Sequence, residues 1–165
     1  MKKTLFSCLM CIMSLSATLL ASCSKDYDEV DGVYVDLGLP SGTMWKDRNE
    51  SCGVNGYFTY DEAVSSFGKK LPTKEQCEEL YNLCDWGWTG QNVVITGPNG
   101  NSIELPAMGY RASNGDVLWD GEGAYYWSST SSISGNAYNL HYWRTGGQVG
   151  EILRNYGHPI RLVKK

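Results

Sequence analysis

The stretch TKEQCEELYNLCDWGW at residues 73–88 decides the fold class, because its periodicity changes in the middle. Thr73 and Gln76 form a capping box, which predicts a helix over Lys74–Cys84. From Asp85 onward, apolar residues recur at every second position, which is the period of a strand. We therefore expect helical segments in the first half of the chain and strands in the second half.

One strand and one further helix are expected before this stretch. Apolar and polar residues alternate over Val33–Gly38, which predicts the first strand. A second capping box, formed by Thr59 and Glu62, predicts a helix over Tyr60–Phe67 that ends at Gly68.

Short strands and tight turns are expected throughout the second half. Strands are predicted over Gln91–Thr96, Ser102–Leu105, Asp116–Trp119, Ala124–Thr130, Ala137–Trp143, Val149–Leu153 and Pro159–Val163. Turns are predicted at Gly97–Asn101, Asn114–Gly115 and Thr145–Gln148. A strand followed by two helices and then by many short strands indicates an α+β domain with one core.

The C-terminal segment is expected to close the domain. Ile160–Val163 is predicted to form a central strand near Val33–Leu37, because its apolar residues would have no use in a free tail. Arg161 lies between apolar neighbours, so a carboxylate or backbone carbonyls are expected to hold it, and we expect no role for it in binding.

The composition limits the classes of protein to which the chain can belong. Of the 165 residues, 19% are charged and 12% are aromatic, which excludes a disordered acidic tail and a coiled coil. The net charge of −4 argues against a nucleic-acid partner, because such a partner requires clustered Lys and Arg.

The first residues have the features of a lipoprotein signal peptide, which is expected over residues 1–22. Lys2 and Lys3 precede the uncharged apolar stretch Leu5–Leu20. Leu20-Ala21-Ser22-Cys23 resembles the bacterial lipobox, in which a peptidase cuts before the cysteine and a diacylglyceryl group is joined to its sulfur. The alternative is an ordinary cleaved signal followed by an accidental cysteine.

A short acidic tether is predicted between the lipid and the domain. Residues 23–32 contain too few apolar side chains to pack, whereas residues 33–165 form the predicted domain. Three acyl chains on Cys23 would exceed the single-chain limit for reversible membrane binding, so we expect stable anchoring through the lipid alone.

Three cysteines remain in the predicted domain, and their pairing stays open. Cys77 and Cys84 lie seven residues apart in one predicted helix, so ~10 Å would separate their Cα atoms and they cannot bridge each other. Cys52 could pair with either of them, or all three could be reduced. The predicted domain has no C-x-x-C motif, so neither a zinc site nor a thioredoxin-like motif is expected there.

Six blocks of the sequence resemble a known family. They are Val35–Trp45, Leu71–Glu75, Gly97–Ile103, Leu105–Arg111, Tyr126–Ser129 and Ile160–Val163. In content and order they are similar to Bacteroidota surface lipoproteins that carry the Fibrobacter succinogenes major paralogous domain.

The resemblance implies a C-type-lectin-like fold, in which two helices flank short antiparallel strands and hairpins, and the N- and C-terminal strands pair. It also implies a place on the outer face of the outer membrane, since an acidic segment after the lipidated cysteine accompanies export there. Members of the family are associated with adhesion, fimbrial tips or ligand display.

No pattern for catalysis or metal binding stands out in the sequence. His141 and His158 have no second ligand at metal spacing, so we expect surface or hydrogen-bonded histidines. The Glu-Pro-Asn, Gln-Pro-Asp and Trp-Asn-Asp tripeptides of calcium-dependent lectins do not occur, and no G-x-S-x-G elbow is present. We therefore expect no enzymatic activity, no cofactor and no metal.

Aromatic residues near the predicted turns are the candidate ligand-binding residues. They are Trp88, Trp119, Tyr125 and Trp143, with Asn139 and Arg144 as hydrogen-bonding neighbours. Sugar rings stack on such side chains, and Tyr and Trp also anchor protein interfaces. The alternative is that the aromatics fill the core, which is favoured for Trp45, Trp86 and Trp127.

These features predict an outer-membrane lipoprotein with a non-catalytic, calcium-independent domain that binds a glycan or a surface protein. A structural or fimbrial accessory component is the alternative, and a hydrolase ranks third.

Overall fold

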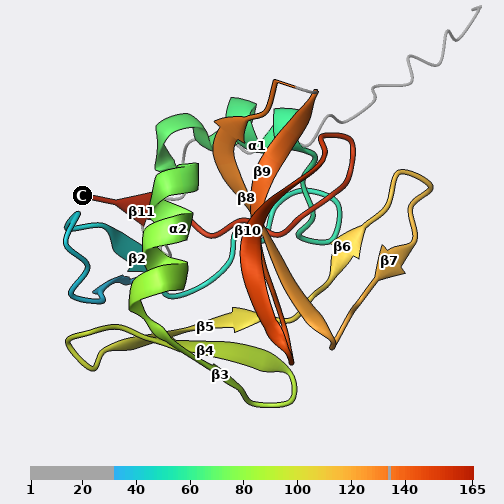
Figure 1. Ribbon diagram of the computed structural model, residues 1–165. Coiled ribbons are helices and arrows are strands. Elements are labelled where there is room, and N and C mark those ends of the chain that lie inside the picture. The colour runs from blue at the N-terminus through green and yellow to red at the C-terminus, as the bar shows by residue number, and fades with distance from the viewer. Residues whose placement is uncertain (1–31, 134) are drawn as a thin grey trace, which may run out of the picture.

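The computed structural model describes residues 32–133 and 135–165. The elements are β1 (Tyr34–Asp36), β2 (Met44–Lys46), α1 (Tyr60–Phe67), the 3-10 helix η1 (Gly68–Lys70), α2 (Lys74–Leu83), β3 (Asp85–Trp88), β4 (Asn92–Thr96), β5 (Ser102–Pro106), β6 (Tyr110–Arg111), β7 (Val117–Leu118), β8 (Gly123–Ser131), β9 (Asn136–Trp143), β10 (Gly146–Leu153) and β11 (Val163–Lys164). Figure 1 shows two α-helices beside several small sheets of mostly antiparallel strands, so the predicted mixed α+β class is confirmed. The predicted signal peptide at residues 1–22, the lipidation site at Cys23 and all of the tether but its last residue lie outside the described residues.

Both predicted helices begin at their capping boxes. The hydroxyl of Thr59 accepts from the Glu62 backbone N–H, and the Glu62 carboxylate accepts from the Thr59 N–H at 2.7 Å. Thr73 and Gln76 make the same pair of bonds at the start of α2. The predictions are confirmed because each box satisfies orphan N–H groups within one turn and needs no tertiary contact.

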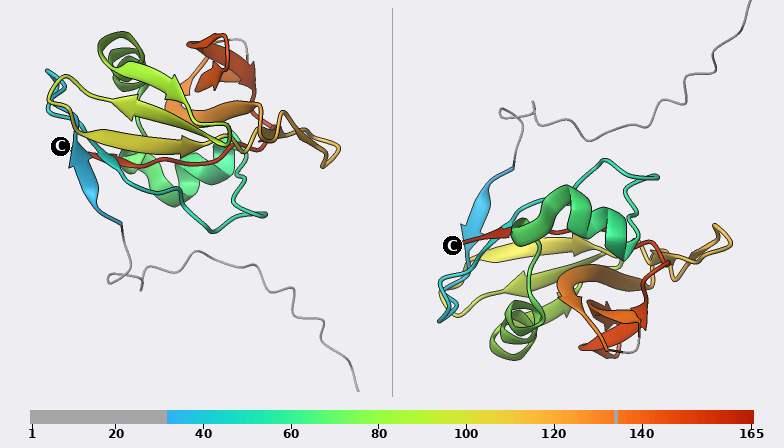
Figure 2. Two further views of the ribbon diagram at one scale, coloured as in Figure 1. Left: turned by 90° about the horizontal axis from the view of Figure 1, so that it is seen from below. Right: turned by 90° about the horizontal axis from the view of Figure 1, so that it is seen from above.

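The first sheet has the order β1-β2-β11. The expectation that the N- and C-terminal strands pair with each other is therefore wrong. β11 pairs with β2, so β2 lies between the N- and C-terminal strands and the two do not pair directly. Figure 2 shows the C-terminus close to these first strands. The predicted strand over Pro159–Val163 is also wrong in its bounds, because Ile160, Arg161 and Leu162 are all buried and their side chains do not alternate across a sheet.

Arg161 is held in the interior, as predicted. Its guanidinium donates to the carbonyl oxygen of Lys46 at 2.8 Å and to that of Glu104 at 2.6 Å. Its Nε donates to Asn49 Oδ1 at 3.0 Å. The side chain therefore ties the C-terminal segment to β2 and β5 through acceptors that would otherwise be buried without a partner.

The second sheet, β3-β4-β5, packs its inner face into an apolar cluster with α2. Trp45 lies in this cluster, and Trp127 lies in a second cluster beneath α1, so the core assignment of both is confirmed. Trp86 is half-buried at the rim of the first cluster, where its ring stacks on Tyr142 with centroids 4.8 Å apart.

The third sheet, β10-β9-β8, carries most of the features described below. The turn predicted at Thr145–Gln148 is wrong in its bounds: it lies at Arg144 and Thr145, and Gly146 already pairs with Trp143 in the ladder. Glycine at position 147 serves close strand pairing there, because a Cβ on Gly147 would lie 2.2 Å from the carbonyl oxygen of His141.

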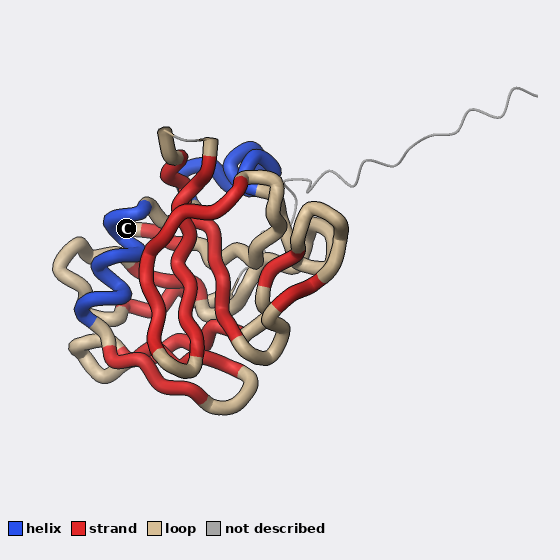
Figure 3. The backbone as a smooth tube through the Cα atoms, turned by 45° about the vertical axis from the view of Figure 1, so that its right-hand side comes forward, coloured by secondary structure: helices blue, strands red, loops and turns tan. Residues whose placement is uncertain are grey.

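The β6–β7 hairpin stands away from the body of the domain in Figure 3. Its turn contains Asn114 and Gly115, as predicted, and the Gly115 N–H donates to the carbonyl of Ala112 at 2.9 Å. Gly109 fixes the base of the hairpin, because a Cβ there would lie 2.0 Å from the carbonyl oxygen of Leu118.

The cysteines differ from both alternatives that the sequence left open. Cys77 and Cys84 are free thiols, whereas Cys52 is disulfide-bonded, so neither helical cysteine is its partner. Within residues 32–133 and 135–165, no helix combines the length and the apolar character that a membrane crossing requires.

Candidate functional site: an aromatic pocket on the third sheet

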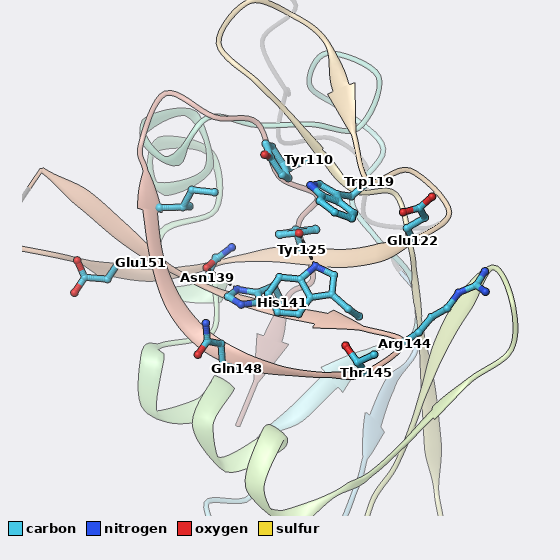
Figure 4. A pocket seen from close by; sticks show the side chains of 12 residues that line it. Tyr110, Trp119, Glu122, Tyr125, Asn139, His141, Arg144, Thr145, Gln148 and Glu151 are labelled. Carbon is cyan, nitrogen blue, oxygen red and sulfur yellow. Dashed lines mark hydrogen bonds between the residues drawn. The ribbon is translucent and has the colours of Figure 1, made fainter.

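A pocket of about 730 Å³ opens on one face of the β8–β9–β10 sheet. Strand β9 contributes Asn139, His141 and Trp143 to its lining, and these alternate residues share one face of the strand. The opposite face of β9 belongs to the core, where Leu140 packs in the same cluster as Leu80 of α2. The sheet thus separates the pocket from the helix, as Figure 4 shows from close by.

The register of the sheet places a row of pocket residues side by side. Tyr125 of β8 lies opposite His141, and Gln148 of β10 lies opposite His141 on the other side. All three line the pocket. One cross-strand row therefore supplies a phenol, an imidazole and an amide to the same surface.

Two glycines on this face make room for the side chains of the pocket floor. Gly150 lies opposite Asn139, and a Cβ on it would come within 3.0 Å of the His141 ring. Gly123 lies opposite Trp143, and a Cβ on it would lie 2.7 Å from the Tyr125 ring. The aromatic and polar side chains occupy the space that these two missing side chains leave.

The base of the β6–β7 hairpin forms one wall of the pocket. Tyr110 and Trp119 both line it, and Figure 4 places their rings above Tyr125. The Trp119 side chain is 52% exposed, and its backbone has a φ of 63°. A bulky residue pays a steric penalty in this left-handed region, so the surrounding contacts must hold it there.

The backbone around Trp119 supplies these contacts. Its carbonyl oxygen accepts from the N–H groups of Glu122 and Gly123, both at 3.0 Å. The turn therefore fixes the direction in which the Trp119 side chain leaves the backbone.

The aromatic rings of the floor contact one another and leave little freedom. Trp143 Nε1 donates to the Tyr125 hydroxyl at 2.6 Å, and the Tyr125 ring lies edge-on to Tyr110 with centroids 5.0 Å apart. Tyr110 in turn stacks on Tyr156 at 5.4 Å. Such contacts hold the floor rigid before any ligand arrives.

Asn139 and His141 form a polar pair at the centre of the floor. His141 Nδ1 and Asn139 Oδ1 are 3.3 Å apart, and both side chains are nearly inaccessible, with 1% exposure for Asn139 and 8% for His141. Asn139 Nδ2 and His141 Nε2 have no hydrogen-bond partner among the residues that the structure describes. The pair thus leaves two polar atoms without a hydrogen-bond partner among the described residues, and both atoms have almost no accessible surface.

Both histidines are buried, so neither lies on the surface. The expectation of a hydrogen-bonded side chain holds for Nδ1 of His141 and is wrong for His158 among the described residues. Burial lowers the pKa of His141 to about 4. The same cause, with a smaller contribution from the neighbouring His141, lowers the pKa of His158 to about 3. Neither ring nitrogen of His158 has a partner among the described residues, and its ring lies 4.1 Å from that of Trp127. Both imidazoles are therefore neutral at pH 7.

Five of the six candidate residues line this pocket: Trp119, Tyr125, Asn139, Trp143 and Arg144. Trp88 does not line it. Its ring packs at the edge of the core, and the Arg144 guanidinium lies 5.5 Å from the ring centroid. Whether these aromatics are exposed or fill the core was left open by the sequence: Tyr125 is buried, with 5% exposure, whereas Trp119 is exposed.

Sequence reasoning missed His141, Gln148 and Tyr110 as pocket residues. The signal for His141 was present, because the predicted strand over Ala137–Trp143 puts it on the same face as Asn139. Gln148 could not be found while it was assigned to a turn.

The charged residues of the pocket lie at its rim. Glu122 and Glu151 are on opposite sides in Figure 4, and Arg144 extends beside Thr145. The Glu151 carboxylate accepts from the Ser132 hydroxyl at 2.6 Å. No group of three or more His, Cys, Asp or Glu in the described part of the chain could hold a metal ion.

Comparisons with known proteins do not extend this picture. No family model matches the chain, and neither a curated protein nor a solved structure matches it.

Proposed function

We propose that this chain is a surface lipoprotein whose domain has a C-type-lectin-like fold and binds a glycan in the aromatic pocket, without calcium and without catalysis. The ligand would stack on the exposed ring of the pocket wall and form hydrogen bonds with the exposed polar side chains of the lining. The lipid on Cys23 would anchor the protein in the outer membrane, with the pocket exposed to the outside.

One observation carries the proposal: a concave surface lined by aromatic rings also carries exposed polar side chains. Sugar rings have an apolar face of C–H groups and an edge of hydroxyls, so they need both kinds of contact. Trp119 offers the apolar contact, whereas Arg144, Thr145 and Gln148 offer polar ones. A core-filling role does not explain the exposed indole.

A second candidate function is docking on a protein partner, and the hairpin favours it. Val117, Leu118 and Trp119 are consecutive and each more than two-fifths exposed. Exposed apolar side chains next to one another often mark protein interfaces. An accessory subunit of a surface assembly would use this hairpin.

A glycan array probed with the full-length protein in detergent tests the first proposal. We expect binding to a restricted set of glycans, and loss of that binding in Trp119→Ala. The matched control is Leu83→Ala, which removes an exposed apolar side chain from α2 on the other side of the sheet and should leave binding unchanged. Absence of binding on the array, or equal binding by both variants, would reject the pocket as a glycan site.

A further inference from the structure

We propose that a lysine-lined groove at the tether end of the domain binds phosphate-bearing headgroups of the membrane that holds the anchor, and so turns the aromatic pocket away from that membrane. The groove has a volume of about 510 Å³, and Lys69, Lys164 and Lys165 are among its lining residues. Lys70 follows Lys69 directly in η1. This proposal rests on the lipid anchor of the proposed function and adds a binding site for the membrane surface.

The four lysines carry positive charge that the domain does not neutralise. All four are exposed, and none of them takes part in an ion pair with a residue that the structure describes. Two carboxylates, those of Glu75 and Glu79, also line the groove. Glu79 already accepts from the backbone N–H of Ser41 at 2.9 Å. The four lysines outnumber the two carboxylates, which leaves an excess of positive charge at this end of the domain.

The groove lies where the chain enters the domain from the tether. Lys164 belongs to β11, which shares a sheet with β1, and its Nζ lies 4.7 Å from the centre of the Tyr34 ring at the start of β1. Eight residues, 24–31, lie between the predicted lipidated Cys23 and Gly32. An extended chain covers at most about 3.5 Å per residue, so Gly32 stays within about 30 Å of Cys23. The tether therefore lets this end of the domain reach the headgroups.

The opposite end of the domain carries negative charge. Figure 1 and both views of Figure 2 show the β6–β7 hairpin on the far side of the molecule from β11. Asp116, Asp120 and Glu122 are exposed in or just after this hairpin, and the one basic residue within residues 110–122 is Arg111. The base of the hairpin also forms one wall of the aromatic pocket. An anionic membrane surface therefore attracts the groove and repels the end that holds the pocket.

The chemistry of the groove suits phosphate-bearing headgroups. The lysine ammonium is a compact point charge on a flexible stem, and it is a common phosphate-binding group. Basic clusters close to a membrane anchor are typical of binding to anionic lipids. Salt screens such attraction beyond about 8 Å at physiological ionic strength, so only the end of the domain next to the membrane takes part.

The test measures how fast a membrane-impermeant, amine-reactive reagent modifies each lysine of the full-length lipidated protein, with mass spectrometry as the readout. The protein is reconstituted into vesicles of phosphatidylcholine alone or of an equimolar mixture of phosphatidylcholine and phosphatidylglycerol. We expect the anionic vesicles to slow modification of the four lysines about fivefold, and high salt to remove the difference. Lys74 is the internal control, because it pairs with Glu78 and does not line the groove.

Paired variants show whether the charge of the groove is responsible. In the double variant Lys164→Gln with Lys165→Gln, the two lysines of η1 should lose their protection in anionic vesicles. The matched control, Lys74→Gln with Arg154→Gln, removes the same charge from two surface ion pairs outside the groove and should keep the protection. All four positions are at least partly exposed, so both variants should fold.

Three results would overturn the proposal. One is equal modification of the four lysines in both kinds of vesicle, which includes equal protection by the acidic tether. Another is loss of the protection in both double variants, because overall charge would then be responsible. The third is equal protection by inorganic phosphate in detergent without lipid, which would assign the groove to free phosphate.

The failure of this proposal is distinguishable from that of the proposed function. A negative glycan array would leave the orientation on the membrane in place, since the groove and the pocket share no lining residue. Absence of lipid on Cys23 would reject the anchor and this proposal with it. A lipidated protein whose four lysines are not protected in anionic vesicles would reject this proposal alone.

Discussion

At the residue scale, the pocket depends on glycines, which leave room for neighbouring side chains, as much as on the residues that line it. Gly150 faces the pocket from the edge strand β10, and a Cβ there would come within 3.0 Å of the His141 ring. We predict that Gly150→Ala pushes the imidazole and weakens glycan binding, while the free energy of unfolding changes by less than about 1 kcal/mol. Gly87→Ala on β3 is the matched control, since its Cβ would have nothing closer than 4.0 Å.

Array binding and urea denaturation of both alanine variants are the measurements. Equal binding by Gly150→Ala and Gly87→Ala would show that the space beside His141 is not used by the ligand.

The buried histidines make a separate prediction about pH. In the folded protein the pKa is about 4 for His141 and about 3 for His158, below the unfolded value of about 6.5. The unfolded chain therefore takes up protons first as the pH falls, so the stabilisation is complete above about pH 6.5 and is lost as the pH falls toward 4. We expect the free energy of unfolding to fall by about 2 kcal/mol for His158 between pH 7 and pH 5, and by less for His141, whose ring borders the pocket.

Urea titrations at the two pH values measure this loss. His141→Gln should lower the pH dependence because only His158 then remains. A free energy of unfolding that is equal at pH 7 and pH 5 would contradict the buried, neutral state of both rings.

At the element scale, the structure separates what local sequence determines from what it does not. Both helices were predictable because Thr59 and Thr73 close their capping boxes within four residues. The face of β9 was also predictable from alternation, although His141 was discounted for want of a metal partner. The turn between β9 and β10 was misplaced because glycine favours turns locally, whereas close strand approach requires it at position 147.

The backbone is strained at Trp119, the residue that directly follows the β6–β7 hairpin. Trp119 has a φ of 63°, a conformation that costs a side chain about 1–2 kcal/mol relative to glycine. We predict that Trp119→Gly and Trp119→Ala lose glycan binding equally, but that the glycine variant is more stable than the alanine variant by about 1 kcal/mol. Guanidinium denaturation of the two variants measures the difference between their free energies of unfolding. Because both variants lack the indole, its loss does not contribute to this difference. If the alanine variant were as stable as the glycine variant, the backbone would not be strained.

At the scale of the whole molecule, contacts between distant segments are what the sequence could not predict. β11 pairs with β2 rather than β1, and Arg161, just before β11, donates to the carbonyls of Lys46 and Glu104, which lie far away in the sequence. The pocket itself needs the hairpin base, β8, β9 and β10 together. Five of its residues were predictable from their residue types and from their nearness to turns. The strand register that brings them together was not predictable.

Attachment of the whole protein to the membrane is tested at Cys23. The lipobox residues 20–23 and the acidic segment behind them predict a thioether-linked lipid on this cysteine. Cys23→Ser removes the sulfur, so the variant should lose palmitate labelling and appear in soluble fractions or remain unprocessed. Unchanged labelling in Cys23→Ser would contradict lipidation at this site.

The C-terminal segment should be necessary for folding of the whole domain. Deletion of residues 159–165 removes the buried Ile160, Arg161 and Leu162 and the last strand of the first sheet. It also strips two buried carbonyls of their guanidinium donor. We expect the deleted chain to be unfolded, because several buried side chains each contribute on the order of 1–3 kcal/mol to a total of about 5–15 kcal/mol.

Circular dichroism and a thermal melt measure the effect, and removal of the exposed Lys165 alone is the control. Arg161→Met refines the result, since it keeps much of the volume but leaves the Lys46 and Glu104 carbonyls unpaired, at a cost of about 1–3 kcal/mol. A cooperative melt at the original temperature after deletion of 159–165 would mean that the strands β1 and β2 close the domain without β11. If the deletion variant is unfolded and Arg161→Met is only less stable, both the burial of the segment and the hydrogen bonds of Arg161 are needed to stabilise the domain.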